Sequence, residues 1–399
     1  MRHLSRLSPR SATRAGRVPA ARTEAGRPAG DGRRSGGRLP SLTGLRFTAA
    51  AGVVFTHCAL LSSPRLARTL GPEVWVGASA VSLFFILSGY VLTHSARPTD
   101  TARSFWRRRA AKILPNHVLT WCVVVGALAF AGTAASGAGS GLVAHLASLF
   151  LVNTWVPSQR FLSAGNPVSW SLAAEGFFYL VFPALLPWIR RLSRRGLLIG
   201  AVSAIALVWI WPVFCALVLN PEGRFFTGYW FLYMLPITRL PEFALGMIAA
   251  RISAEGIRLP RIGVLPAALG VISAIIVNSS FLPHEFMYAA STVAPLVVLV
   301  HATAELDLRG GRSLLRTAPL VFLGEISYAM YLVHLVVLGL MFVGLTHLGW
   351  SALAAILAAL PVIFLLSWLV YAGVERPCMR RFSTSRAHRR DRHRPAVAP

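Results

Sequence analysis

The sequence of 399 residues contains few charged side chains and very few acidic ones. Charged residues make up 14% of the chain, against about a quarter in ordinary soluble proteins. Hydrophobic residues make up 55%, and the mean hydropathy is +0.59. Only 14 residues are Asp or Glu, whereas 40 are Lys or Arg. These proportions argue against a soluble enzyme and leave a strongly basic, strongly apolar chain to be explained.

Cysteine is also scarce. The four cysteines, at positions 58, 122, 215 and 378, show no paired spacing, and the first three lie in apolar runs. The sequence therefore predicts neither a disulfide framework nor a zinc site, and we assign no residue as a metal ligand.

The apolar residues are gathered in long runs. A helix needs about 20 apolar residues to cross ~30 Å of hydrocarbon, and ten runs approach that length. We therefore expect an all-α, polytopic membrane protein with about ten transmembrane helices. An additional run, 142–153, is too short to span and predicts an interfacial or re-entrant helix. The ten predicted spans are 42–62, 74–94, 113–132, 170–189, 196–217, 229–250, 262–280, 286–303, 318–340 and 350–373.

The basic residues follow the segments between these spans. With a cytoplasmic amino terminus, ten spans place 34 of the 40 basic residues on the cytoplasmic side, as the positive-inside rule requires. We expect both termini in the cytoplasm and the chain in the plasma (inner) membrane. The excess positive charge then follows from topology and from contact with membrane lipid, and it needs no nucleic-acid partner. The basic segments are 1–41, 97–112, 190–195, 251–261, 309–316 and 376–399.

Two tails flank the predicted membrane domain. Residues 1–40 are rich in Arg, Gly, Ala and Pro and contain almost no large apolar residues, so we expect a disordered cytoplasmic tail. No apolar core typical of a secretory signal peptide follows the early arginines. We assign the membrane domain to residues 41–377 and a second basic cytoplasmic tail to residues 378–399.

The first span contains two ionisable residues, Arg46 and His57. Ionisable groups within a membrane are costly and mark functional sites by default. Their separation of eleven residues places both on one helix face, about 16 Å apart along the axis. The alternative is structural: Arg46 extends to the headgroups and His57 bonds a neighbouring helix.

Further polar residues lie in later spans. Span four begins with Trp170, Ser171 and Leu172 and then contains Glu175 and Tyr179. In span nine, three polar residues share one helix face, as the wall of a polar cavity or a stripe of interhelical hydrogen bonds would require. They are Ser327, Tyr331 and His334.

Two other groups have competing interpretations. Arg239 and Glu242 lie three residues apart, and we favour a structural ion pair within one helix. Arg108, Arg109 and Lys112 precede span three. This second group either anchors the helix to the cytoplasmic side or binds phosphates through charge-assisted hydrogen bonds.

Six motifs in chain order resemble acyltransferase family 3 over residues 42–380. Each motif is weak alone, but six in register are specific. The first is Leu42-Thr43-Gly44-Leu45-Arg46 followed by ten residues and His57. The others are Leu83-Phe84-Phe85-Ile86-Leu87-Ser88-Gly89-Tyr90, the basic run into Ile113-Leu114-Pro115, Trp170-Ser171-Leu172 with Glu175 and Phe178-Tyr179, Gly324-Glu325-Ile326-Ser327-Tyr328 through His334, and Glu375-Arg376-Pro377.

The resemblance implies a ten-span enzyme that moves acyl groups, often acetyl, from acyl-CoA to hydroxyls of surface polysaccharides, peptidoglycan, lipid-linked glycans or macrolides. It implies catalytic roles for Arg46 and His57, and CoA binding by the basic motif. In this motif the chain has Lys112 where the family has a second Arg, so a point charge replaces the bidentate fork. The family usually has Glu and Gln after the position of Glu175, but this chain has Gly176 and Phe177. A two-carboxylate mechanism is therefore not supported.

We expect an acyl-CoA donor and no permanently bound cofactor. His57 is predicted to act as the general base on the acceptor hydroxyl, since its intrinsic pKa suits that role. Glu175 is predicted to orient the imidazole, with Arg46 as the third catalytic residue. Covalent catalysis by Cys58 is a lesser option, because that side chain points about 100° away from His57.

Two predicted sets complete the site. Arg108, Arg109 and Lys112 bind the donor, and the acceptor pocket contains Trp170, Ser171, Tyr179, Ser327, Tyr331 and His334. The acceptor is a hydroxyl-bearing macrolide or glycan, and we favour a macrolide or other secondary metabolite. The alternative function is a transporter or flippase, although no repeated halves typical of many transporters are evident.

Overall fold

The computed structural model describes residues 38–63, 71–130 and 141–382. These residues form helices and loops, and the described ranges contain no β-strand. Within them, ten helices are long and apolar enough to cross a membrane, which confirms the all-α, ten-span prediction. The long helices are α1 (Pro40–Ser62), α3 (Pro72–Ser95), α4 (Ala102–Phe130), α7 (Trp170–Arg190), α8 (Arg194–Phe214), α10 (Pro236–Ala254), α11 (Val264–Phe281), α13 (Ala290–Leu308), α14 (Ala318–His347) and α15 (Ala352–Val370).

Short elements extend or connect these helices. The short α-helices are α5 (Gly141–Leu149), α6 (Gln159–Leu162), α9 (Phe225–Tyr229), α12 (His284–Met287) and α16 (Arg376–Phe382). Three π-helical segments, at Cys215–Leu219, Trp230–Met234 and Tyr371–Glu375, and three 3₁₀ turns, at Asn153–Trp155, Pro167–Ser169 and Leu314–Arg316, complete the set.

Most span ends differ from the sequence prediction by a few residues, and two differences affect the architecture. Helix α4 begins at Ala102, eleven residues before the predicted start of span three, because the basic segment is itself helical. The sixth span is broken: α9 and a π-helical turn end at Leu235, and Pro236 starts α10. Proline tolerates the first turn of a helix but not its interior, so the chain changes direction there. The run 142–153 forms the nine-residue α5, too short to span, as predicted.

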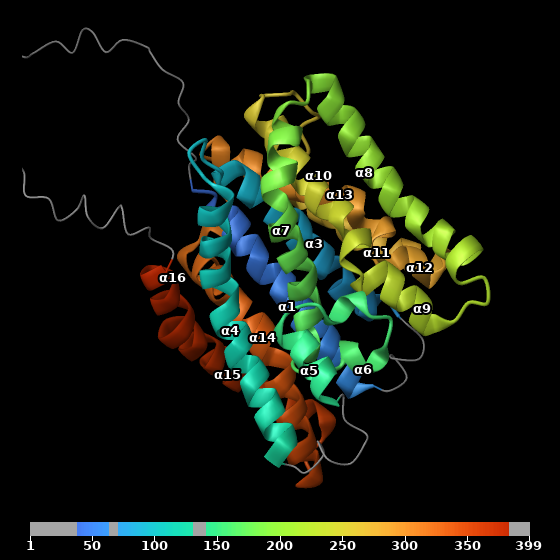
Figure 1. Cartoon of the computed structure of the whole chain (residues 1–399), viewed down its shortest axis with the longest axis vertical. Helices are drawn as coiled ribbons and strands as arrows, with labels where there is room; N and C mark the ends of the chain where they lie inside the picture. Colours follow the sequence, from blue (N-terminus) through green and yellow to red (C-terminus); the bar gives the residue numbers. More distant parts are fainter. Residues whose placement is uncertain (1–37, 64–70, 131–140, 383–399) are drawn as a thin grey trace, which may run out of the picture. The chain divides into compact units, whose positions relative to one another are not determined.

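Helices α3 and α10 form the buried centre of the bundle (Figure 1), and they are the two most buried spans. Two glycines allow their close approach. A Cβ at Gly89 would collide with the carbonyl of Phe243, and a Cβ at Gly246 would collide with that of Ile86. Small residues at helix contacts are typical of membrane bundles. Helix α1 packs on α3 and on α14, and α15 packs on the outer side of α14.

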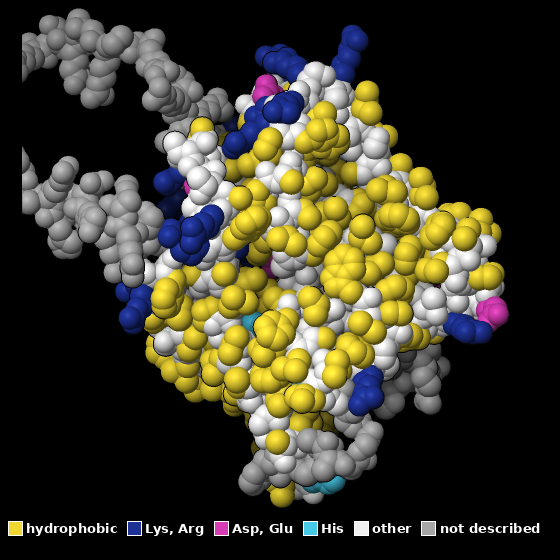
Figure 2. Space-filling model, viewed as in Figure 1, with side chains coloured by type: hydrophobic (Ala, Val, Ile, Leu, Met, Phe, Trp, Pro, Cys, Tyr) yellow, Lys and Arg dark blue, Asp and Glu magenta, His cyan; other side chains and the backbone are white. Residues whose placement is uncertain are grey.

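Apolar side chains cover most of the face seen in Figure 2, with Lys and Arg side chains at its edges. The spans of α11, α8, α4 and α15 are the least buried, and they expose Leu, Ile, Val and Trp. Such a surface is stable against lipid chains rather than water. The structure is therefore that of a multi-pass membrane protein.

The two predicted tails lie almost entirely outside the described residues. Residues 1–37 and 383–399 are not described. Of the predicted carboxyl-terminal tail, residues 378–382 belong to α16.

Candidate active site

A polar cavity lies between α1, α3, α4, α7 and α14, with a free volume of about 100 Å³. Charged and hydroxyl side chains line it from five helices that are distant in sequence. It collects eight of the twelve residues that the sequence analysis assigned to the site, namely Arg46, Arg109, Lys112, Ser171, Glu175, Tyr179, Ser327 and Tyr331.

Glu175 is held inside the polar cavity by two hydroxyl donors. Ser88 donates to its Oε1 at 2.7 Å, and Tyr179, one turn further along α7, donates to the same oxygen. These bonds fix the carboxylate in the wall between α3 and α7. The sequence signal for Ser88 was only its place in a family motif.

Lys112 bonds to a residue that the sequence analysis left without a role. Its Nζ forms an ion pair with Glu375, which is fully buried, and Asn116 donates to the other carboxylate oxygen at 2.6 Å. The charge of Lys112 is therefore matched within the protein. The sequence signals for Glu375 were its position near the end of a strongly apolar run and its place in the motif Glu375-Arg376-Pro377, and neither pointed to Lys112.

Arg46 and Arg109 differ from Lys112 in this respect. Both line the polar cavity, yet neither has an ion-pair partner among the described residues. Arg109 lies 5.9 Å from the ring of Phe105, and its Nε is buried without a hydrogen bond in that part of the chain. The polar cavity thus contains two guanidinium groups that form no ion pair with a described residue, and guanidinium is the side-chain group best suited to bind phosphates or a carboxylate.

A second, aromatic cavity of about 140 Å³ lies deeper along α1. Two predicted site residues, His57 and Trp170, line it. Tyr331 and Val81 line both cavities and so form the wall between them. Arg46 and His57 therefore face the same side of α1, as predicted, but different cavities.

His334 of α14 contacts His57 directly. Its Nε2 lies 3.2 Å from Nδ1 of His57, and the ring centroids are 5.1 Å apart. His334 is completely buried, whereas His57 is partly exposed to the aromatic cavity.

Backbone carbonyls fix the tautomers of both rings. Nδ1 of His334 lies 2.7 Å from the carbonyl of Tyr331 and 3.2 Å from that of Met330, so it must carry the proton. Nδ1 of His57 lies 3.0 Å from the carbonyl of Val53 and must also donate. In neutral imidazole the second nitrogen is then an acceptor. The single Nδ1–H of His57 is thus shared between the carbonyl of Val53 and Nε2 of His334, and His57 Nε2, which has no partner among the described residues, holds a free lone pair.

Glu175 does not contact His57. Its carboxylate faces the polar cavity, and the position beside the imidazole that the sequence analysis gave to Glu175 is occupied by His334. Cys58 lines neither cavity and packs instead against the apolar cluster formed by α1, α14 and α15.

The loop before α7 positions the wall between the cavities. Asn166 donates to the carbonyl of Leu332 at 2.7 Å and so ties this loop to α14. Ser171 and Tyr331 then meet with their hydroxyl oxygens 2.6 Å apart. Burial lowers the pKa of His145 in α5, and its neutral Nδ1 accepts the amide N–H of Gly165 at 3.1 Å.

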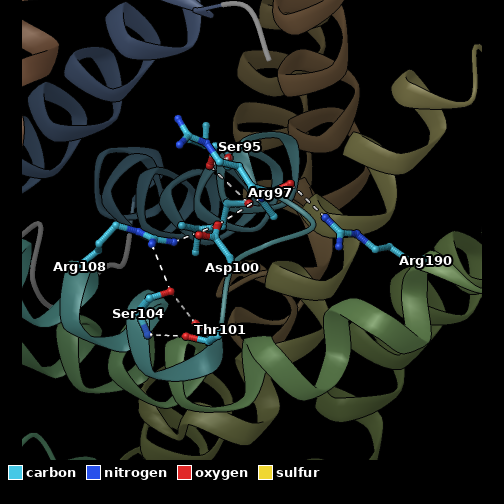
Figure 3. A network of polar contacts seen from close by, with 10 residues as sticks. Ser95, Arg97, Asp100, Thr101, Ser104, Arg108 and Arg190 are labelled. Atoms are coloured by element: carbon cyan, nitrogen blue, oxygen red, sulfur yellow. Dashed lines mark hydrogen bonds and ion pairs between the residues drawn. The ribbon is translucent and has the colours of Figure 1, made fainter. Parts of the chain in front are cut away.

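Arg108 lines a third, basic cavity of about 530 Å³ between the α3–α4 loop and α7. Figure 3 shows its network: Arg108 pairs with Asp100 at 3.0 Å, and Arg190 donates to the carbonyl of Ala96. Arg109 lines both this cavity and the polar one. The basic cavity therefore adjoins the polar cavity at Arg109.

The predicted ion pair between Arg239 and Glu242 is confirmed. Arg239 Nε donates to Glu242 at 2.6 Å, both side chains are fully buried, and Arg239 also donates to Ser82 at 2.9 Å. The pair fastens α10 to α3.

Comparison with known proteins gives consistent matches. A family model described as an acyltransferase domain matches residues 39–372. Acyltransferase MdmB of Streptomyces mycarofaciens is 37% identical over 363 residues, which cover 86% of this chain and 92% of that protein. Exopolysaccharide production protein ExoZ of Rhizobium meliloti is 30% identical over 327 residues, covering 79% and 93%.

A more distant relative is the putative O-acetyltransferase SACOL0978 of Staphylococcus aureus. It is 24% identical over 339 residues, which cover 75% of this chain and 50% of that protein. No solved structure matches the chain.

Proposed function

The chain belongs to the acyltransferase family whose domain model spans residues 39–372, and on that premise we propose that this membrane O-acyltransferase uses acyl-CoA as its donor. We further propose that His57 is the general base on an acceptor hydroxyl. The observation that carries the proposal is the free Nε2 of His57 at the edge of a cavity, with the ring held in the base tautomer by the carbonyl of Val53 and contacted by His334.

Acyl-CoA has a phosphorylated nucleotide, a long flexible arm and a thioester, and the three cavities accommodate these parts in order. We assign the nucleotide phosphates to the basic cavity, where Arg97, Arg108 and Arg190 converge. The arm then passes Arg109 into the polar cavity. The thioester end then reaches past Tyr331 and Val81, where the two cavities adjoin, to the side of His57. The small free volume of the polar cavity supports a short acyl group such as acetyl.

The reaction follows from this arrangement. His57 Nε2 takes the proton of the acceptor hydroxyl, and the acceptor oxygen attacks the thioester carbonyl. The C–S bond then breaks, and the imidazolium of His57 gives the proton to the departing CoA thiolate. His334 Nε2 accepts a hydrogen bond throughout and stabilises the charged ring of His57. Arg46 and Arg109 stabilise the negative charge of the donor and of the leaving thiolate.

The acceptor is proposed to be a macrolide or another hydroxylated secondary metabolite, with a surface glycan as the second candidate. The similarity to two acyltransferases of different biological settings is compatible with both. Mass spectrometry of metabolites and cell-wall glycans from a deletion strain distinguishes them, because the acceptor loses one acyl mass.

We propose that the basic cavity faces the cytoplasm, where acyl-CoA is found. The excess of basic residues in the connected segments supports this orientation, and the protein would then lie in the plasma membrane with both termini inside. Reporter fusions after Phe382 and within the loop at Glu222 test it: a cytoplasmic signal only from the first supports the orientation, and the reverse pattern contradicts it.

The purified chain in detergent tests the donor. With acetyl-CoA and an extract containing the acceptor, the enzyme should release free CoA, whereas a transporter or flippase should leave the thioester intact. A Cys58→Ser variant is the matched control, since Cys58 lines neither cavity, and normal turnover there also excludes a covalent route. Loss of CoA release in that variant would contradict the mechanism.

A further inference from the structure

The aromatic cavity has features of a binding site for a particular class of acceptor. We propose that it binds the reacting part of the acceptor as an uncharged, hydroxyl-bearing ring, such as a neutral sugar or a hydroxylated macrolactone. The inference rests on the acyltransferase function proposed above and specifies its second substrate.

The walls of this cavity carry rings and hydroxyls but no fixed charge. Among the described residues, no Asp, Glu, Lys or Arg lines it, in contrast to the polar cavity on the other side of Tyr331. An anionic group, such as a phosphate or a carboxylate, would therefore lose its hydration here without a cation to replace it. The chemistry of the walls excludes acceptors that place an anion beside His57.

Five aromatic side chains form one continuous surface in the cavity. The Trp170 ring lies 4.5 Å from that of Tyr233, and Tyr288 joins Tyr233, Tyr229 and Trp75 at centroid distances between 5.4 and 5.9 Å. Such rings offer flat apolar faces with polar edges. They suit a ligand that has an apolar ring face and hydroxyls around it.

Three of these side chains have hydroxyls without a partner. Tyr288 is 4% exposed, and its Oη is buried with no hydrogen bond in the described part of the chain. Tyr229 and Tyr233 likewise form no side-chain hydrogen bond there. Buried hydroxyls are normally paired. Hydroxyls of a ligand ring would satisfy the buried Oη of Tyr288 and could also bond those of Tyr229 and Tyr233, which are half-buried.

A cationic ligand is disfavoured by the protein itself. Tyrosine rings attract cations, but the guanidinium of Arg239 already lies 5.3 Å from the ring of Tyr233. No Asp or Glu among the described residues lines the aromatic cavity, so an ammonium group would also lose its hydration there without a carboxylate to replace it. An amino sugar is therefore expected outside the cavity rather than in it.

The cavity also places the ring correctly for reaction. His57 and the five aromatic residues line the same space. Its volume of about 140 Å³ exceeds the ~30 Å³ of one water, so part of a small ring fits. A ring hydroxyl bonded to Nε2 of His57 would then lie beside Tyr331 and Val81, where the thioester enters from the polar cavity.

Binding is measured without turnover on the full-length His57→Ala variant in detergent, by tryptophan fluorescence and isothermal calorimetry. The probes are methyl β-glucoside and a neutral polyhydroxylated macrolactone, which distinguish the two sources, and methyl glucuronide and glucosamine as charged counterparts. We expect at least one neutral probe to bind at least tenfold more tightly than both charged probes. Adding Tyr288→Phe should weaken that binding about fivefold or more, whereas Tyr90→Phe, which alters a hydroxyl bonded to Ser253 outside the cavity, should not.

Binding of glucuronide or glucosamine as tight as that of the neutral probes would overturn the inference, as would the absence of neutral binding or an unchanged affinity in Tyr288→Phe. A different result would contradict the proposed function, namely release of free CoA by the same His57→Ala variant. Neutral binding together with such release would leave the binding site standing and refute only the general base.

Discussion

His57 on α1 and His334 on α14 form a hydrogen-bonded pair, with 3.2 Å between Nδ1 of the first and Nε2 of the second. The carbonyls of Tyr331 and Val53 fix the proton on Nδ1 of each ring. The hydrogen bond between the two rings therefore runs from Nδ1–H of His57 to Nε2 of His334, and Nε2 of His57 keeps a free lone pair. His334 is a positioning residue that acts through His57.

Removing the acceptor on His334 should slow the chemical step. We expect His334→Leu to lower kcat by ~10²-fold or more, because the imidazolium of His57 loses the hydrogen-bond acceptor that stabilises it. The KM for acceptor should change little, since His334 does not line the aromatic cavity. His334→Gln, whose amide oxygen can accept the same bond, should recover part of kcat. Equal kcat in the Leu variant and the wild type would refute the positioning role.

Arg109 should control donor affinity. Hydrogen bonds to charged groups are worth about 1.5–3 kcal/mol, so Arg109→Ala should raise the KM for acyl-CoA roughly ten- to hundredfold. Arg109→Lys should recover only part of this loss, because the ammonium lacks the fork of the guanidinium. Arg195→Ala, at an exposed basic residue outside the three cavities, is the control. An unchanged donor KM in Arg109→Ala would place the donor elsewhere.

Lys112 should matter more for stability than for donor binding. Lys112→Met leaves Glu375 buried without its counter-charge, and breaking such a pair costs about 3–5 kcal/mol. The double variant Lys112→Met, Glu375→Gln should regain most of the loss, since the amide still accepts from Asn116. Thermal unfolding in detergent measures both. Equal melting temperatures for Lys112→Met and the wild type would contradict the ion pair's role.

The contact between α3 and α10 depends on Gly246. Its Cβ position collides with the carbonyl of Ile86, so Gly246→Val must separate the helices, at a cost of about 1–3 kcal/mol or more. Gly344→Val on α14 has no heavy atom within 4 Å of the new Cβ and serves as control. We expect a lower melting temperature only for the first, and a similar loss in both would show that the close approach is not the cause.

The spans were predictable because length and hydropathy are local properties. The ion pair of Arg239 and Glu242 was predictable because helical spacing alone brings the two side chains together. The same spacing placed Arg46 and His57 on one face, but it gave no sign that Tyr331 of another helix separates their surroundings.

Contacts between distant helices were not predictable in this way. Glu175 was assigned to His57 because both are ionisable residues in the membrane, yet only the packing of α1 against α14 brings His334 to the imidazole. The ion pair of Glu375 was likewise not predictable, since its partner Lys112 lies 263 residues away in the sequence. The aromatic cavity combines α3, α7, α9 and the chain before α13, and its tyrosines occupy no common motif.

The central claim is that Nε2 of His57 removes the proton of the acceptor hydroxyl. The most direct measurement is the acceptor-dependent release of free CoA by purified His57→Ala, compared with wild type and with His301→Ala, a histidine that bonds Ser253 outside the cavities. We expect the rate of CoA release to fall at least ~10²-fold in His57→Ala, while this variant still binds acyl-CoA as the wild type does. His301→Ala should release CoA at the normal rate. Release by His57→Ala at the wild-type rate would contradict it.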